Sequence, residues 1–244
     1  MTRQPVPETV SRDASLADRA PARSALASLL VSLRPEQWTK NLVVFAGLLF
    51  GRQLLDPRAV GLAVAAFAIF CLLSGVVYLL NDVADREADR NHPLKSRRPI
   101  ASGELAPGTA LAAAALLGAV AFAGAFALGP AFGLVSLAYV ALLGAYSARL
   151  KHMVIIDVLT IAIGFVLRAV AGAVVIEVPI SQWLLVCTVL LALFLALSKR
   201  RHEIVLLAGG APGHRRILGE YSPYLLDQMI GVVTASTLIA YIFY

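Results

Sequence analysis

The sequence predicts an all-α, polytopic membrane protein, and three observations support this fold class. First, 59% of the 244 residues are hydrophobic and 15% are charged, and the mean hydropathy is +0.79, whereas a soluble domain is about half apolar and about a quarter charged. Second, mostly apolar runs of roughly 20 residues recur, which is the length that spans a bilayer as a helix. Third, basic residues collect in alternate loops between these runs.

Seven segments are predicted to span the membrane. They cover residues 40–55, 59–80, 106–127, 131–148, 154–176, 181–198 and the run that starts near 225. The first is the weakest because Arg52 interrupts it. The third and fourth are separated by Gly129 and Pro130. The last is still apolar at Tyr244, so we expect the chain to be part of a longer protein.

The N-terminal residues 1–23 are polar and contain three prolines and mixed charges. They lack the apolar core of a signal peptide, which predicts a disordered cytosolic tail. Residues 24–244 are then one membrane domain. Cys71 and Cys187 both lie inside apolar runs, where cysteine behaves as a small hydrophobic residue.

The charge pattern predicts the orientation and the class of partner. The net charge is +6, which in a soluble protein raises nucleic acid as a partner. Here the basic loops follow the second, fourth and sixth segments, as the positive-inside rule requires of cytoplasmic loops. We therefore expect a multi-pass protein of the cell (inner or plasma) membrane with a cytoplasmic N-terminus. An anionic substrate is expected and nucleic acid is not, while a homo-oligomer remains open.

An acidic cluster follows the second segment, where residues 81–89 read N-D-V-A-D-R-E-A-D. If the helix continues, at about 100° per residue, Asp85 and Asp89 fall within roughly 60° of Asp82, with Asn81 close to Asp85. Carboxylates crowded on one strip repel one another unless a cation lies between them. Hard oxygen donors favour Mg²⁺ that also binds substrate phosphates. The alternative is a solvated helix end, but charge at a membrane boundary is usually functional.

The cluster resembles the first aspartate motif of the UbiA superfamily of intramembrane prenyltransferases. Two further stretches resemble one branch, the decaprenyl-phosphate phosphoribosyltransferases: R-P-E-Q-W-T-K-N at residues 34–41, and His92-Pro93 through Arg97-Arg98-Pro99-Ile100. The resemblance implies a helical bundle around a central cavity, usually of about nine spanning helices, so the last two would be missing here. It also implies that Asn81, Asp82, Asp85 and Asp89 are the metal-binding and catalytic residues.

Basic and tyrosine residues near these motifs are the candidates for binding substrate phosphate. They are Arg34, Lys40, Lys95, Arg97, Arg98, Tyr146, Arg149, Lys151, Lys199, Arg200 and Arg201. Two alternatives stay open. Arg34 and Lys40 flank Trp38, as an interfacial anchor would. The remaining cations also satisfy the positive-inside rule without any ligand.

Three more charged residues are candidates for supporting roles around the site. Asp157 and Arg168 are eleven residues apart, about three helical turns, so they share one face of the fifth segment. Arg168 lies deep in an apolar run and must face a cavity or a partner. Glu203 follows the basic run at the end of the sixth segment. A structural role for Asp157 and Arg168 is as consistent with the pattern as a catalytic one.

The loop after the sixth segment departs from the wider superfamily, whose prenyltransferases carry a second D-x-x-x-D there. This chain has S-K-R-R-H-E at residues 198–203. Direct contacts from cations to phosphate would replace a second metal. The resemblance thus implies transfer of 5-phosphoribose from 5-phosphoribosyl 1-diphosphate (PRPP) to decaprenyl phosphate or another polyprenyl phosphate. The reaction releases diphosphate and supplies precursors of cell-wall arabinan.

Two other functions remain open on the sequence. One is a UbiA-type aromatic prenyltransferase for a quinone or haem precursor, in which the lipid carries the diphosphate. The other is a transporter of ions or lipid phosphate that uses Asp157 and Arg168 as its path. Polar motifs on only one face disfavour alternating access.

Overall fold

The structure is a computed structural model that describes residues 23–208 and 221–243, and every regular element in these ranges is helical. Six helices are long and apolar enough to cross a membrane, α9 by its residues up to Val205. They are α3 (Pro57–Ala84), α6 (Pro107–Ala127), α7 (Pro130–Ala148), α8 (Ile156–Val175), α9 (Gln182–Ala208) and α10 (Pro223–Phe243). The all-α membrane fold is therefore confirmed, and six of the seven predicted spans match these helices.

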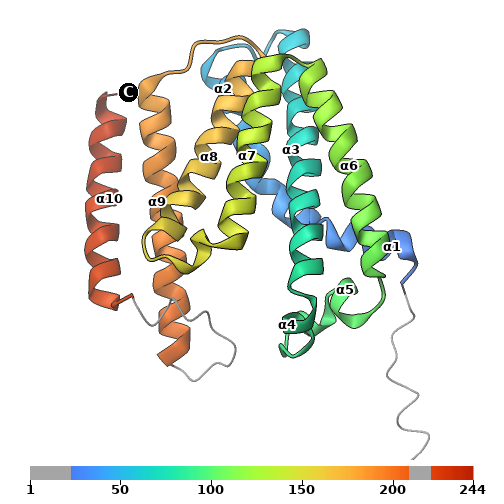
Figure 1. Cartoon of the computed structure of the whole chain (residues 1–244). Coiled ribbons are helices and arrows are strands. Elements are labelled where there is room, and N and C mark those ends of the chain that lie inside the picture. Colours follow the sequence, from blue (N-terminus) through green and yellow to red (C-terminus); the bar gives the residue numbers. More distant parts are fainter. Residues whose placement is uncertain (1–22, 209–220, 244) are drawn as a thin grey trace, which may run out of the picture.

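The six long helices lie side by side in one bundle (Figure 1). Along it, α10 packs on α9, α9 on α8, α8 on α7, α7 on α6 and α6 on α3, while α3 also contacts α8. The largest core cluster lies between these helices, where Phe70 packs against Phe132 and Tyr139. Many outward side chains are large and apolar, as expected of a surface that faces lipid.

Helix starts follow local sequence rules. Pro57, Pro107 and Pro130 each occupy the first turn of a helix, where a backbone N–H has no partner to lose. Asp56 precedes Pro57 and accepts a hydrogen bond from the backbone N–H of Arg58 at 2.9 Å. Between α6 and α7, Gly129 has φ +140°, a conformation that favours glycine. These signals explain why the boundaries of α6 and α7 match the sequence predictions within one residue, whereas α3 and α9 extend beyond the predicted ends at 80 and 198.

The predicted spanning helix over residues 40–55 is not present. The segment from 25 onward is instead broken into α1 (Ala25–Ser32), the 3₁₀ helix η3 (Pro35–Phe45) and α2 (Ala46–Phe50). Arg34 separates the first two with a left-handed φ of +54° before Pro35. In Figure 1 this segment runs obliquely across the bundle from α1 to α2, behind α3 and α8.

Two glycines explain how this broken segment fits against α8. A Cβ atom on Gly172 would lie 1.7 Å from the carbonyl oxygen of Val44, and one on Gly47 would lie 2.7 Å from the backbone nitrogen of Ala173. The two backbones therefore pack directly on each other. This close approach brings η3 against the face of α8 that carries Arg168.

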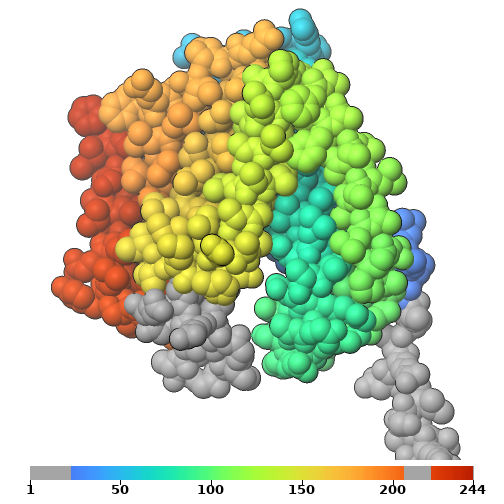
Figure 2. All heavy atoms as spheres, viewed as in Figure 1, coloured from blue at the N-terminus to red at the C-terminus, as the bar shows by residue number. Residues whose placement is uncertain are grey.

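Most of the predicted polar motifs lie at one end of the bundle. The short elements α4 (Arg86–Arg90) and α5 (Pro99–Ser102), with η4 (Lys95–Arg97) between them, lie at the lower end in Figure 1, where α3 and α9 also end. The surface is hollowed there, between the teal end of α3 and the yellow end of α8 (Figure 2). Residues 1–22 of the predicted disordered tail lie outside the described residues.

Candidate active site

The predicted acidic strip is interrupted at its middle. Helix α3 ends at Ala84, and Asp85 is its C-cap with φ −90° and ψ 5° before α4 begins. Asp82 and Asp89 are buried, whereas Asp85 is exposed and Asn81 is partly buried. The structure thus turns two of the three carboxylates inward and leaves the third at the surface.

Three cations contact the two buried carboxylates. Arg98 Nη1 lies 3.0 Å from Asp82 Oδ1 and 2.6 Å from Asp89 Oδ2, so one guanidinium bridges both. Arg34 Nη2 also donates to Asp82 Oδ1 at 2.5 Å. Lys95 Nζ lies 3.7 Å from Asp89 Oδ1. Because these cations and the carboxylates carry opposite charges, the contacts relieve the repulsion between the carboxylates that a metal was predicted to relieve.

The oxygen donors of this cluster suit Mg²⁺ chemically, and Asp82 Oδ2 is contacted by neither arginine. Among the described residues, however, no three acidic, histidine or cysteine side chains are grouped closely enough to hold a metal ion. Asp82, Asp85, Asp89 and Asn81 are the residues that the sequence predicts would hold Mg²⁺. In the arrangement described, the Arg98 guanidinium neutralises two of them.

Arg34 is placed by its backbone and by an aromatic ring. It adopts a left-handed φ of +54°, a conformation that costs about 1–3 kcal/mol outside glycine and persists where the surroundings enforce it. Its guanidinium lies 4.7 Å from the centre of the Tyr78 ring, a favourable cation–π position. The side chain is thereby directed at Asp82, one turn further along α3.

Arg168 is buried inside the bundle with neutral partners. Its Nε donates to Asn41 Oδ1 at 2.8 Å, its Nη1 to the Gly164 carbonyl oxygen at 2.9 Å, and its Nη2 to Tyr139 Oη at 2.6 Å. Asn41 in turn donates from Nδ2 to Ser74 Oγ at 3.0 Å. The guanidinium is therefore well hydrogen-bonded, but these partners do not cancel its charge. Buried charge inside a membrane is costly and usually functional.

Four cations act on one region, and they come from three elements: η3 with its N-cap Arg34, α8 and α9. Burial lowers the pKa of the Lys40 ammonium, and the positive charges of Lys199, Arg168 and Arg34 lower that pKa further, so these cations lie near enough to repel it. Within the described ranges, no carboxylate comes within ion-pair distance of Lys40 or Arg168. This region is therefore positive, and it adjoins Asp82 through Arg34. Such a region attracts phosphate groups.

The positive charges of the basic run on α9, residues 199–201, are balanced by neighbouring carboxylates. Lys199 Nζ lies 3.9 Å from Glu203 Oε1, Arg200 Nη1 lies 2.5 Å from Glu203 Oε2, and Arg201 Nε lies 2.9 Å from Asp227 Oδ1. Each cation thus has a carboxylate partner. Helix α9 also runs through these residues without a break, so they lie on a helix and not in the predicted loop.

Asp157 forms a second buried network. Its Oδ2 accepts from Arg200 Nε at 2.9 Å and its Oδ1 accepts from Tyr221 Oη at 2.7 Å. Tyr221 Oη also accepts from the backbone N–H of Ile155 at 2.6 Å. Burial and the hydrogen bond to Asp157 raise the pKa of Tyr221 to about 12, so the phenol stays protonated and remains a donor near neutral pH. Asp157 and Arg168 share α8 but belong to different networks.

The remaining phosphate-binding candidates are more dispersed. Arg97 and Arg149 are exposed, while Lys151 and Tyr146 are partly buried. In the described part of the chain no ion pair joins Arg97, Arg149 or Lys151 to a carboxylate. These three cations remain available to an anionic ligand at the end of the bundle that holds the acidic cluster.

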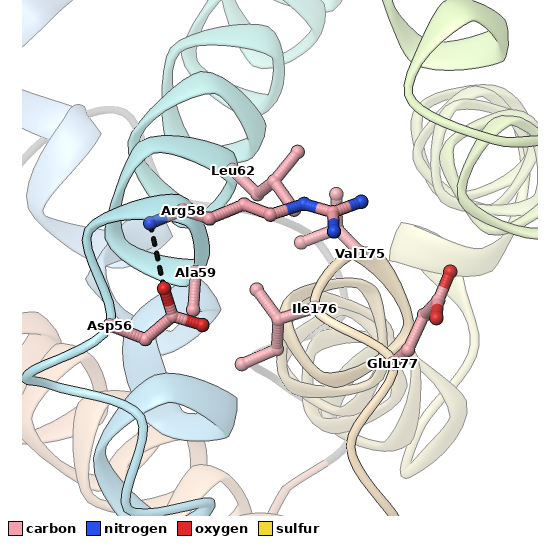
Figure 3. A pocket seen from close by; sticks show the side chains of 7 residues that line it. All are labelled: Asp56, Arg58, Ala59, Leu62, Val175, Ile176 and Glu177. Carbon is pink, nitrogen blue, oxygen red and sulfur yellow. Dashed lines mark hydrogen bonds between the residues drawn. The ribbon is translucent and has the colours of Figure 1, made fainter.

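A separate small pocket lies at the opposite end of α3. It has a volume of about 120 Å³, with Asp56, Arg58 and Glu177 at its rim and apolar side chains such as Leu62 and Ile176 along its walls (Figure 3). It contains one cation and two carboxylates, which does not favour an anionic ligand. The pocket is therefore unlike the cation-rich region around Lys40.

Comparison with known proteins decides the family. Residues 41–203, more than half of the chain, match the UbiA prenyltransferase family. The chain belongs to this family. The resemblance predicted from the acidic cluster is therefore confirmed, and the matched range includes that cluster, Arg168 and the basic run on α9.

Two relatives have names that are more specific than the family description. The chain is 35% identical over 210 residues to a decaprenyl-phosphate phosphoribosyltransferase of Mycolicibacterium smegmatis, covering 84% of this chain and 66% of the relative. It is 37% identical to the protein of the same name in Mycobacterium tuberculosis, covering 84% of this chain and 70% of the relative. The chain thus spans about two-thirds of the length of these relatives.

Solved structures confirm the UbiA fold. The structure of a UbiA homologue from Archaeoglobus fulgidus bound to GPP and Mg²⁺ matches with a TM-score of 0.61 at 20% identity, over 87% of this chain and 86% of that one. At this identity the likeness shows the shared fold. The ligands named there belong to the archaeal protein.

Sequence reasoning missed several polar residues of this UbiA fold. Tyr221, Tyr139 and Ser74 were not singled out, although each makes a buried hydrogen bond in the networks of Asp157 or Arg168. Tyr139 and Ser74 are polar groups inside apolar spans, and that position was the available signal. Tyr221 lies 64 positions from its partner Asp157, so no local sequence pattern indicates this hydrogen bond.

Proposed function

We propose that this UbiA-family protein is a polyprenyl-phosphate phosphoribosyltransferase. It transfers 5-phosphoribose from PRPP to decaprenyl phosphate, or to a polyprenyl phosphate of similar length, and releases diphosphate. The product supplies arabinose for cell-wall arabinan. Relatives at 35–37% identity bear the matching name, and the positive region next to Asp82 supports the same chemistry.

The observation that carries the proposal is the gathering of Arg34, Lys40, Arg168 and Lys199 around one region. The proposed substrates bring three phosphate-bearing groups: the 5-phosphate and the 1-diphosphate of PRPP, and the phosphate of the lipid. A prenyl diphosphate with an aromatic acceptor brings only one. Cations from three separate elements suit several separate phosphates better than a single diphosphate.

The chemistry exchanges one bond at the anomeric carbon for another. The bond from C1 of ribose to the diphosphate oxygen breaks, and an oxygen of the lipid phosphate forms the new bond to C1. The lipid phosphate is already anionic, so no general base is needed. The protein's contribution is then alignment of the two substrates and stabilisation of the departing charge.

The acidic cluster is the proposed metal site. Asp82 and Asp85, with Asn81 and Asp89, would hold Mg²⁺, which when bound supplies charge neutralisation for the diphosphate. Arg98 and Lys95 lie against the same carboxylates. Because these cations have side chains about a quarter to a half exposed, they are placed to turn from carboxylate to phosphate when the substrate arrives.

The end of the bundle that carries these groups is proposed to face the cytoplasm. PRPP is water-soluble, and the cations of the short elements between α3 and α6 follow the positive-inside rule. Single cysteines at Arg97 in η4 and at Arg58 in the first turn of α3, which lie at opposite ends of the bundle (Figure 1), test the orientation in intact cells. Labelling by an impermeant thiol reagent is expected at position 58 and not at position 97.

A transfer assay tests the function directly. Purified protein in nanodiscs is given PRPP labelled in the ribose, decaprenyl phosphate and Mg²⁺, and label in the lipid fraction is counted. We expect labelling that is lost with a chelator and in Asp82→Ala. Lipid labelling that survives both treatments would overturn the metal mechanism, and absence of labelling from the wild type would overturn the function.

An aromatic prenyltransferase is the second candidate, because one observation favours it. The three cations of α9 are paired with carboxylates, so they are a weaker substitute for a second acidic motif than the sequence suggested. Geranyl diphosphate with 4-hydroxybenzoate in the same nanodiscs separates the two functions. Prenylation of the aromatic acid without any transfer from PRPP would favour this candidate.

A further inference from the structure

Five side chains form one continuous line of contacts from the interior to the surface. Tyr221 donates to Asp157, Asp157 pairs with Arg200, Arg200 pairs with Glu203, and Glu203 lies 3.9 Å from the Lys199 ammonium. We name the first four of these residues the Arg200 lock. It joins the start of α8, the end of α9 and the residues just before α10.

Arg200 is held too tightly to bind a substrate phosphate itself. The exposed fraction of its side chain is 3%, and that of Asp157 is 0%. Turning the guanidinium toward a ligand would leave the Asp157 carboxylate buried without a cation, and removing one partner of a buried pair costs about 3–5 kcal/mol. A surface ligand would have to supply that free energy before it gained any affinity.

Lys199 is the cation at the open end of this line. Its side chain is 67% exposed, and its charge acts on Lys40 in the positive region. Glu203 holds both cations with different oxygens, Oε2 on Arg200 and Oε1 on Lys199. The place of the Lys199 ammonium is therefore set through Glu203 by the buried pair.

The backbone at the base of the lock supports a positioning role. Ile155 has φ +68°, an unfavourable conformation for a β-branched residue. Its N–H donates to Tyr221 Oη at 2.6 Å, so the hydroxyl that orients Asp157 also holds this strained turn. Strain of this kind persists where the surroundings enforce it and is concentrated at functional sites.

We propose that Arg200 is a positioning residue, fixed by Asp157 and Tyr221, which through Glu203 holds the Lys199 ammonium where it contacts a substrate phosphate. The proposal rests on the proposed function for the identity of that substrate. It separates two adjacent residues of the basic run by role: Lys199 contacts substrate, and Arg200 acts only through it.

A double-mutant cycle tests the proposal. KM for PRPP and for decaprenyl phosphate is measured for Lys199→Ala, Glu203→Gln and Lys199→Ala/Glu203→Gln in nanodiscs. Lys199→Ala is expected to raise one KM about tenfold or more, since it removes a charged contact. Glu203→Gln keeps an acceptor for Arg200 and is expected to raise the same KM about threefold, on the scale of a partly exposed ion pair. In the double variant, Glu203→Gln should add nothing to the effect of Lys199→Ala.

Arg200→Lys is the second arm of the test. A lysine keeps a cation beside Asp157 but loses the fork that reaches Glu203, so the protein is expected to fold. Its increase in KM should also disappear in the Lys199→Ala background. If either Glu203→Gln or Arg200→Lys raises KM by the same factor with and without the Lys199 amine, the proposal is overturned, because that residue then acts on substrate directly.

Asp227→Asn is the matched control, since it weakens the neighbouring exposed pair with Arg201. It is expected to leave both KM values unchanged. If the wild type transfers nothing from PRPP, the proposed function fails. The positioning of Lys199 is then tested by the reactivity of its amine. Acetylation of Lys199, followed by mass spectrometry, should be faster in Glu203→Gln and Arg200→Lys and unchanged in Asp227→Asn. Equal rates in all variants would overturn the lock.

Discussion

Two groups of buried carboxylates lie in this molecule, and they differ in how their cations are exposed. Asp82 pairs with Arg34 and Arg98, whose side chains are 24% and 28% exposed. Asp157 pairs with Arg200, whose side chain is 3% exposed. In both groups an acid is almost fully buried, so the difference lies entirely on the cation side.

That difference separates exchangeable pairs from fixed ones. Asp82 has two partly exposed arginine partners, so one of them can turn toward water or a ligand while the other still pairs with the buried carboxylate. Arg200 cannot turn away in this manner, because the Asp157 carboxylate would remain charged, buried and without a cation. We infer that the Asp82 group works in the reaction, whereas the Asp157 group holds the helices in register.

The largest expected effect is on stability, at the sealed pair. Asp157→Ala leaves Arg200 buried without its deep partner, which should destabilise the protein by about 3–5 kcal/mol. Thermal unfolding in nanodiscs or detergent measures the loss. Asp227→Ala, which breaks the exposed pair with Arg201, is the control and should change stability by less than about 1 kcal/mol. Equal losses of stability in Asp157→Ala and Asp227→Ala would contradict the distinction between the buried and the exposed ion pair.

The next effect is on activity, at the exchangeable group. Asp82→Asn keeps the shape of the side chain and removes its charge, so transfer should fall by about 100-fold or more, the scale seen when one electrostatic contributor is removed. The melting temperature should change little, because Arg34 and Arg98 can both be solvated. A large loss of stability in Asp82→Asn would show that its ion pairs are as structural as those of Asp157.

A third prediction concerns the contact that joins the two regions. Gly172→Ala places a Cβ 1.7 Å from the Val44 carbonyl oxygen, which must push η3 away from α8. Overpacking of this kind destabilises by about 1–3 kcal/mol, and here it should also lower activity by displacing the segment that carries Arg34. Gly61→Ala in α3 is the control, since nothing lies within 4 Å of its added Cβ. Measured stability and transfer rate should both be unchanged in that control.

The smallest expected effect is a loss of stability at high pH that comes from Tyr221 in the Asp157 group. Tyr221 has a pKa raised to about 12 by burial and by its hydrogen bond to Asp157, above the unfolded value of about 10. Its stabilising contribution is therefore complete below about pH 10 and is lost as the pH rises toward 12. Melting temperatures from pH 8 to 11.5 should fall more steeply in the wild type than in Tyr221→Phe. Parallel curves would show that this hydroxyl does not carry the dependence.

The long helices could be predicted because apolar length and flanking proline, glycine and charge are local signals. Residues 107–127 and 130–148, for example, were placed within one residue at each end. The course of residues 40–55 could not be predicted from the sequence. It depends on the hydrogen bond between Asn41 and Arg168, 127 positions away, and on the close packing of Val44 against Gly172. Hydropathy contains no information on such contacts.

The candidate site shows the same division. The types of residue at Asp82, Asp89 and Arg98 indicated an electrostatic site, but their pairing depends on where α3 ends. A single break at Asp85 removes one carboxylate from the expected strip. For the run at 199–201, the sequence showed three adjacent cations and could not show that their partners lie up to 43 positions away.

The Arg168 guanidinium, held by neutral groups in the middle of the bundle, has a consequence for handling the protein. An anion that binds near this charge binds the folded state and not the unfolded chain, so it stabilises the fold in proportion to the logarithm of its concentration. Phosphate or diphosphate in the buffer should therefore raise the melting temperature, whereas chloride at equal ionic strength should raise it less. The diphosphate that the protein is proposed to release would then also be an additive that preserves the protein during purification.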